Sequence, residues 1–183
     1  GVEVGQQFKP GGTEKVKDRN GVDLVFTPTI DTDLILDSNI ENAGYRPMRY
    51  IPDSNVDKPE NDYVIMLYSD ALLMKAEAKN GLDMDPSFEI NEIRKRAYGG
   101  AYNDHVFING SKSENDDAIL NERLFELAFE GKRWWDLLRF DKAFELVPTL
   151  QTQTDKQYLR LFPIANSVLS LEPKVQQNPG YQQ

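Results

Sequence analysis

Residues 119–140, ILNERLFELAFEGKRWWDLLRF, combine many charges with many large apolar side chains in one short stretch. Glu122, Glu126 and Glu130 recur every four residues, so they lie along one stripe of a helix. Like charges at this spacing repel each other, and burial beside the neighbouring aromatic residues would increase the repulsion unless cations were supplied. The stretch is therefore predicted to be a partly buried helix in which arginines neutralise the glutamates.

Arginines that could serve this purpose occur both within the stretch and on the neighbouring predicted helices. A guanidinium group binds a carboxylate through two parallel hydrogen bonds, which suits a bridge that is shielded from water. We predict an ion-pair lattice that ties the helices together, with Asp70 as a natural further member. Its other expected members are Glu77, Arg94, Arg96, Glu122, Arg123, Glu126, Glu130, Arg133, Asp136 and Arg139.

Two helical patterns precede this stretch. Residues 63–78 are apolar nearly all round and lie between an N-cap at Asp62 and a C-cap at Asn80-Gly81, which predicts a buried helix. Residues 85–100 predict a second helix that ends at a pair of glycines. The apolar stripe of this second helix consists of Phe88, Ile90, Ile93 and Ala97.

The later half of the chain predicts a second helical hairpin after a polar loop at 101–117. One helix is expected to begin at about Asp117 and to end or kink at Gly131, and its partner is expected over 132–146. Two hairpins joined by a loop are typical of tetratricopeptide-like stacking, although the two hairpins share no repeat motif.

The two ends of the chain have few helix signals. Residues 1–62 are rich in Gly, Pro, Asp and Asn; they contain a short strand candidate at 21–30 and an extended stretch at 45–53. The fold class predicted is mainly α: tetratricopeptide-like helical hairpins with long irregular loops and an extended C-terminal tail. We expect an irregular segment at 1–62, a helical scaffold at 63–147 and a tail at 148–183 packed on the scaffold, together forming one structural unit of a larger protein.

Composition excludes several classes of function. A formal charge of −9 and a pI near 4.7 argue against nucleic acid and against an anionic membrane surface, because both partners require a basic face. The chain has no cysteine, so it has neither a disulfide framework nor a thiolate metal site. It starts at Gly1, and we expect any targeting segment to lie outside it.

Catalytic interpretations are less favoured than structural ones. Carboxylates one helical turn apart approach the ~5 Å separation of a retaining glycosidase pair, but surrounding arginines lower carboxylate pKa values, whereas a general acid needs a raised one. His105 is the only histidine, which excludes a di-iron site with paired Glu-x-x-His motifs. The acidic residues of 31–37 are interpreted as a solvated loop, with a calcium site as the less favoured alternative. We predict no enzyme activity, no cofactor and no metal.

Four stretches, taken in order, resemble the C-terminal half of the SusD/RagB outer-membrane lipoproteins of Bacteroidetes. They are LYSDALLMKAEAKN (67–80), INEIRKRAYGG (90–100), LNERLFELAFEGKRWWDLLRF (120–140) and LFPIANSVLSLEPKVQQNPGY (161–181). The third is similar to the family signature E-R-x-x-E-L-A-F-E-G-x-R-W-x-D-L-x-R. The chain departs from the family pattern at 163–166, where a second proline is usual, and it lacks the N-terminal half that carries the lipid-modified cysteine.

The resemblance implies a cell-surface protein that binds a glycan, glycopeptide or peptide and delivers it, without catalysis, to a SusC-like TonB-dependent transporter. It also implies an outer-membrane location through a lipid anchor outside this chain. The alternative is a helical-repeat module whose groove binds a protein partner.

Ligand contacts cannot be carried over from the family motif, so they are predicted from the residue types on two loops. Sugar recognition uses flat aromatic faces together with polar groups, held on loops by a rigid scaffold. The predicted ligand-binding residues are Tyr45, Arg46, Tyr50, Tyr98, Tyr102, Asn103, His105 and Phe107, with Asn42 and Asp104 beside them. Two alternatives stay open: these aromatic residues pack only against their own loops, or the ligand site lies in the missing N-terminal half.

Overall fold

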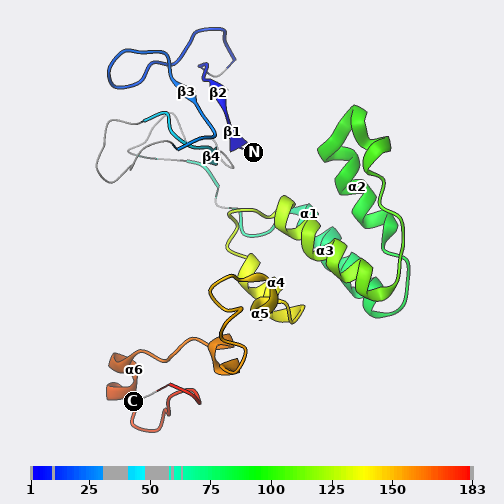
Figure 1. Cartoon of the computed structure of the whole chain (residues 1–183), viewed down its shortest axis with the longest axis vertical. Coiled ribbons are helices and arrows are strands. Elements are labelled where there is room, and N and C mark those ends of the chain that lie inside the picture. Colours follow the sequence, from blue (N-terminus) through cyan, green and yellow to red (C-terminus); the bar gives the residue numbers. More distant parts are fainter. Residues whose placement is uncertain are drawn as a thin grey trace. The chain divides into compact units, whose positions relative to one another are not determined.

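The structure is a computed structural model that describes residues 2–9, 11–30, 41–47, 58, 60–62 and 64–181. The chain divides into two compact units, Gly1–Tyr63 and Val64–Gln183 (Figure 1). None of the helices in these described ranges combines the length and the apolar character needed to cross a bilayer.

The first unit is built from short antiparallel strand pairs. Strand β1 (Val2–Glu3) pairs with β4 (Arg46–Pro47), and β2 (Gly5–Gln6) pairs with β3 (Val25–Phe26). The predicted strand at 21–30 therefore contains β3, and the extended stretch at 45–53 contains β4. Residues 48–53 of that stretch, with Tyr50, and the acidic loop at 31–37 lie outside the described residues.

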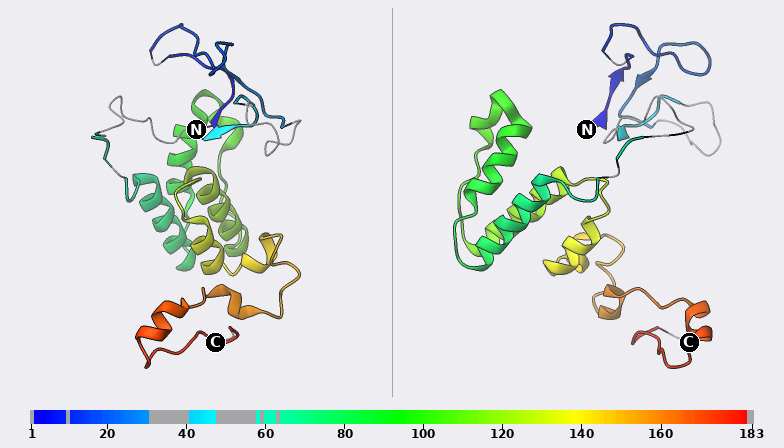
Figure 2. Two further views of the ribbon diagram at one scale, coloured as in Figure 1. Left: turned by 90° about the vertical axis from the view of Figure 1, so that its left-hand side faces the viewer. Right: turned by 180° about the vertical axis from the view of Figure 1, so that it is seen from behind.

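The second unit is helical. It contains α1 (Tyr68–Gly81), α2 (Ser87–Tyr98), the 3-10 helix η1 (Gly99–His105), α3 (Lys112–Glu126), α4 (Arg133–Arg139) and α5 (Ala143–Leu146). Helix α1 contacts both α2 and α3, and Figures 1 and 2 both show α1 beside α3. The fold is thus mainly α, as predicted.

Three groups of apolar side chains hold these helices together. Leu73, Ile93 and Leu127 belong to a cluster that joins α1, α2 and the end of α3. A second cluster joins the same three helices further along and also contains Phe107 from the loop after η1. A third cluster, with Leu120 and Leu137, attaches α4 and α5 to α3. The expected stripe of α2 is partly wrong, because Phe88 and Ala97 are exposed while Glu89 is buried.

Helix α1 begins later than predicted. The prediction placed its start after Asp62, but its N-cap is Leu67, whose extended backbone (φ −95°, ψ 155°) leads into Tyr68. Val64 and Ile65 just before it are β-branched and favour extended backbone. The Leu67 side chain packs against the first apolar cluster, which fixes the point where the chain turns into the helix.

Helix α3 begins earlier than predicted, at Lys112 instead of about Asp117. A capping box explains the difference: the Ser111 hydroxyl accepts from the Glu114 N–H, and the Glu114 side chain accepts from the Ser111 N–H at 2.8 Å. The S-x-x-E spacing at 111–114 is the sequence signal for such a start. The polar composition of 101–117 favoured the prediction of a loop over these residues instead.

The helix predicted over 132–146 is broken into α4 and α5. Asp141 adopts the left-handed conformation (φ 57°), and the Lys142 N–H donates to the Leu137 carbonyl at 2.8 Å. This is the geometry of a Schellman motif, which ends a helix by satisfying its last carbonyls. Aspartate tolerates the left-handed region better than most residues.

An asparagine network joins the C-terminal end of α1 to the N-terminal end of α3. The Asn80 side-chain amide donates to the Lys112 carbonyl at 2.9 Å and to Asp116 at 2.7 Å. The Asn115 amide in turn donates to the side-chain oxygens of Asn80 at 3.0 Å and Asn109 at 2.9 Å. Asn80 and Asn115 are both buried.

The C-terminal segment holds more helix than the predicted extended tail, namely η2 (Gln157–Arg160) and α6 (Asn166–Leu171). Its last residues fold back onto 161–164. Gln177 exchanges two hydrogen bonds with the Ile164 backbone at 2.7 and 2.8 Å, the Asn178 amide donates to the Phe162 carbonyl at 2.7 Å, and the Tyr181 hydroxyl donates to the Leu161 carbonyl at 2.6 Å. These bonds order the segment without a long helix.

Candidate functional site

The charged helix of the opening stretch takes part in a buried ion-pair network. Arg123 of α3, only 5% exposed, lies 3.0 Å from Asp70 of α1 and 2.9 Å from Asp136 of α4. Both contacts are within ion-pair distance, although they fall outside strict hydrogen-bond geometry. One guanidinium group thus connects three helices.

Two further cations complete this network. Lys132 donates to Asp70, and Arg139 contacts Asp136 at 2.9 Å while also binding Glu77. Burial raises the pKa of the Asp70 carboxyl, but the hydrogen bond from Lys132 and the charge of Arg123 outweigh that effect and hold its pKa below the ordinary value. The hydrogen bonds that Arg139 donates to the Glu77 carboxylate raise the pKa of Arg139 above its ordinary value.

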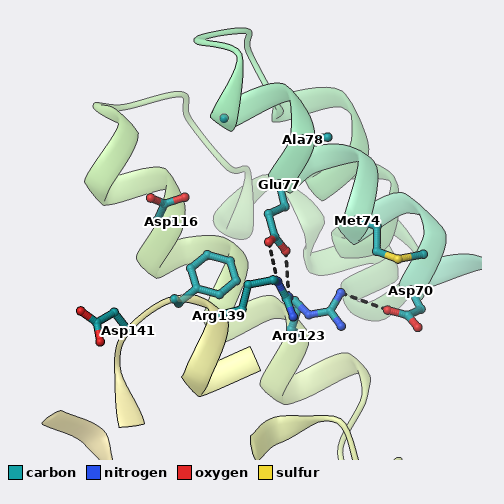
Figure 3. Close-up of a pocket in the computed structure, with 10 residues that line it drawn as sticks. Asp70, Met74, Glu77, Ala78, Asp116, Arg123, Arg139 and Asp141 are labelled. Atoms are coloured by element: carbon teal, nitrogen blue, oxygen red, sulfur yellow. Dashed lines mark hydrogen bonds and ion pairs between the residues drawn. The ribbon is translucent and has the colours of Figure 1, made fainter. Parts of the chain in front are cut away.

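A pocket with a volume of about 730 Å³ opens beside this network. Figure 3 shows the side chains of Arg139 and Arg123 between Glu77 and Asp70. Asp116 and Asp141 also line the pocket, but Asp116 accepts from Asn80 and Asp141 pairs with Arg160. The charged groups of the pocket therefore have partners within the helical unit, which are opposite charges except for the neutral amide that binds Asp116.

The other predicted members of the lattice occupy different surroundings. Arg94 of α2 binds Glu122 through its Nε at 2.6 Å, and Arg96 pairs with Glu126 nearer the surface. Glu130 is partly buried in the turn after α3, where its backbone N–H donates to the Leu127 carbonyl at 3.1 Å.

Arg133 does not bridge a glutamate as expected. Its Nη1 donates to the Leu120 carbonyl at 2.8 Å, and burial lowers the pKa of its guanidinium while the charge of Asp136 opposes that effect. Arg133 starts α4, and from there its side chain reaches back to the backbone of α3. Lys132, which is not among the predicted members of the lattice, supplies the charge to Asp70 instead.

A second buried carboxylate, Glu89, was not predicted from the sequence. Glu89 of α2 is fully buried and lies 2.9 Å from Lys75 and 2.8 Å from Lys79 of α1. Burial raises the pKa of the Glu89 carboxyl, but hydrogen bonds from Lys79 and Lys75 outweigh it and leave the pKa below the ordinary value. The two lysines are four residues apart on one face of α1, which is the signal that could have identified the pair.

Several of the predicted ligand residues meet around η1. The rings of Tyr98 and His105 stack with centroids 3.8 Å apart and an interplanar angle of 11°. Tyr102 lies under the ammonium group of Lys95 at 5.8 Å, and Asn103, the next residue, is exposed. The η1 turn begins at Gly99 with a positive φ of 52°, which reverses the chain and returns His105 to Tyr98.

Phe107 does not belong to this exposed group. It is 7% exposed and packs in the second apolar cluster, while its backbone N–H and carbonyl bond to the Asn91 side chain at 2.8 and 3.1 Å. Its predicted ligand role is corrected to a core role, because the apolar ring fills the space between α1, α2 and α3.

The predicted residues of the first unit differ in exposure. Tyr45 is 54% exposed. Arg46 donates to the carbonyls of Ala43 at 2.9 Å and Glu41 at 2.7 Å and lies over the Phe26 ring at 5.0 Å. Arg46 therefore stabilises its own turn. Within the described ranges, no group of three or more potential metal-ligating His, Asp or Glu side chains is present.

The hairpins of the second unit and the ion pairs between them define a helical scaffold of the tetratricopeptide type. The SusD family model matches residues 29–149, and the chain belongs to that family. It is 36% identical over 129 residues to SusD-like protein P38 of Formosa agariphila, a match that covers 67% of this chain and 25% of the relative. SusD-like protein P2 of the same organism is 32% identical over 156 residues, which are 76% of this chain and 30% of the relative.

Solved structures agree with this assignment. NanU of B. fragilis is 37% identical with a TM-score of 0.52, covering 67% of this chain and 28% of that structure. A SusD superfamily protein from Bacteroides vulgatus is 35% identical with the same TM-score, covering 66% and 28%. The chain therefore spans between a quarter and a third of the length of these relatives.

Proposed function

We propose that this chain is part of a cell-surface protein that binds a glycan, glycopeptide or peptide and passes it to a SusC-like TonB-dependent transporter. Membership of the SusD family supports this proposal. The structural observation that carries it is the aromatic group formed by the exposed Tyr98 and His105 and the partly exposed Tyr102 on a helical scaffold.

The aromatic group suits a ligand with both apolar and hydroxylated surfaces. The stacked Tyr98–His105 pair offers flat ring surfaces, and the exposed Asn103 and Asp104 supply polar side chains on the same turn. Aromatic faces bind the C–H surfaces of sugars, while amides and carboxylates bind hydroxyl groups. Because η1 follows α2 directly, the position of this group is set by the packed helices.

The carboxylates of the scaffold support binding without catalysis. A general acid needs a raised pKa, whereas the pKa values of Asp70 and Glu89 are both lowered. Glu122 and Glu126, the candidates for a glycosidase pair, are each bound to an arginine of α2. Hydrolysis of a chromogenic glycoside that is abolished by Glu122→Gln would contradict this part of the proposal.

Isothermal titration calorimetry with a panel of oligosaccharides and peptides tests the binding role. Tyr102→Ala and Tyr98→Ala should weaken binding at least tenfold and leave the melting temperature within about 2 °C of the parent. Tyr68→Ala is the matched control, because Tyr68 is 79% exposed on α1 and outside the aromatic group. Equal affinity in all three variants would place the ligand site elsewhere in the protein.

A further inference from the structure

The turn between α3 and α4 exposes large apolar side chains beside a pocket. The pocket has a volume of about 460 Å³ and is lined by Leu124, Leu127, Ala128, Phe129 and Trp134. Phe129 is 74% exposed and Phe125, four residues earlier, is 71% exposed. We call Leu124, Phe125, Phe129 and the pocket the α3–α4 face. Exposed apolar patches of this kind mark sites of association.

The backbone at Phe129 is unusual. Its φ is +66°, in the left-handed region that a bulky aromatic residue rarely adopts. Such a conformation persists where the surrounding structure enforces it and is often tied to function. Here Leu127, two residues before it, is buried in the core, and Lys132, three residues after it, is paired with Asp70. The turn between these two fixed points therefore presents the Phe129 ring to the outside.

The polar groups around the face are already engaged. Lys132 pairs with Asp70, Arg133 donates to the Leu120 carbonyl, and Arg123 is buried between Asp70 and Asp136. These cations are not available to bind the hydroxyls of a saccharide. The chemistry of the face thus fits apolar side chains of a polypeptide.

One hydrogen-bond donor at the pocket also has no partner among the described residues. The indole N–H of Trp134 is buried and has no acceptor among the described residues. Buried donors in finished protein cores are almost always paired.

The length of the relatives identifies the occupant. This chain spans 25% and 30% of the two curated relatives and 28% of each solved structure. In these relatives, most of the polypeptide lies outside the part that matches this chain. We infer that the α3–α4 face packs against apolar side chains from the part of the SusD-family fold that these 183 residues do not span.

Cysteine labelling tests this inference directly, because the chain contains no cysteine of its own. Phe129→Cys is made in the 183-residue chain and in a graft in which this chain replaces the matching part of SusD-like protein P38. Maleimide labelling of residue 129, followed by peptide mass mapping, should be at least tenfold slower in the graft. Ile108→Cys is the control, since Ile108 is 81% exposed outside the face, and its labelling should change less than threefold.

Labelling of residue 129 at equal rates in the two proteins would overturn the inference. So would labelling in the 183-residue chain that slows with protein concentration, because the occupant would then be a second copy. SusD-like protein P2 is the second host; grafts that fail to fold in both hosts would count against the inference, since the face would not fit the rest of a SusD-family fold. Failure of the ligand experiment above leaves this test unaffected.

Discussion

Arg139 of α4 binds both carboxylate oxygens of Glu77 of α1 across 62 residues of sequence, with Nε–Oε1 at 2.6 Å and Nη2–Oε2 at 2.9 Å. The same guanidinium group also donates to Asp136 at 2.9 Å, and Asp136 contacts Arg123. The partly exposed Arg139–Glu77 ion pair is thus connected, through Asp136, to the buried ion pairs of Arg123. Figure 3 shows this bridge among the residues that line the pocket, where it joins α4 to α1.

Loss of the central arginine should be costly. Arg123→Ala leaves Asp70 and Asp136 buried with one cation fewer each, and we expect the free energy of unfolding to fall by about 3–5 kcal/mol. Lys95→Ala is the control, because Lys95 pairs with Glu92 at the surface, with side chains 53% and 40% exposed, and a surface pair contributes about 0–1 kcal/mol. Urea denaturation followed by circular dichroism measures both. Equal losses in the two variants would contradict the dominance of the buried network.

Acid should weaken the helical unit. The pKa values of Asp70 and Glu89 are lowered in the folded state from ordinary values of 3.8 and 4.5, so the folded protein binds fewer protons than the unfolded chain. Their contribution to stability is complete above about pH 5, and it is lost as the pH falls through the lowered values. Melting temperatures measured from pH 6 to pH 2 should show this decline. The decline should be smaller in Asp70→Asn, although that variant is less stable at neutral pH.

Removal of the capping box should shorten α3. Ser111→Ala deletes the acceptor for the Glu114 N–H and should cost about 0.5–2 kcal/mol of stability. Ser113→Ala, an exposed serine within the same helix, should change stability by less than about 0.5 kcal/mol. Chemical denaturation compares the two. A larger loss in Ser113→Ala would mean that the cap does not set the helix start.

Gly180 is required for the closure of the C-terminal segment. It has a φ of +93°, and a Cβ at this position would meet the Tyr158 ring well inside contact distance. Gly180→Ala should therefore separate residues 177–181 from 158–164 and speed proteolysis there at least fivefold.

Gly100→Ala is the control for this experiment, because its Cβ would meet nothing within 4 Å. Limited proteolysis under native conditions, with the cut sites located by mass spectrometry, gives the rates. Unchanged cleavage between residues 158 and 178 in Gly180→Ala would show that the ring yields to the added methyl group.

The helical hairpins and the ion pairs between α2 and α3 could be predicted from sequence because both follow from helical spacing. The apolar positions recur at 3.6-residue intervals, and Arg94 and Glu122 are complementary charges on adjacent helices. The resemblance to the family signature indicated the same helices and the same charged positions.

Helix boundaries and burial were harder to predict because they depend on tertiary contacts. Leu67 delays α1 by packing into the core, and the left-handed Asp141 divides the last predicted helix. Phe107 looked like a loop aromatic residue, but its position beside Ile90 and Ile119 is set by packing that no local pattern reveals. The burial of Glu89 likewise depends on the packing of α2 against α1, although the spacing of Lys75 and Lys79 on one face of α1 was a usable signal for the ion pair.

The second unit contains two Asn-Gly sequences, at Asn80 and Asn109, and the asparagine network gives them different chemical lifetimes. Deamidation requires the following backbone nitrogen to attack the side-chain carbonyl, which a helical, fully bonded asparagine cannot arrange. Asn80 is 2% exposed with its amide held by Lys112 and Asp116, whereas Asn109 is exposed on a loop. A stored preparation should therefore gain a negative charge at residue 109 before it gains one at residue 80. Isoaspartate at residue 80 would record each time the end of α1 has opened away from α3.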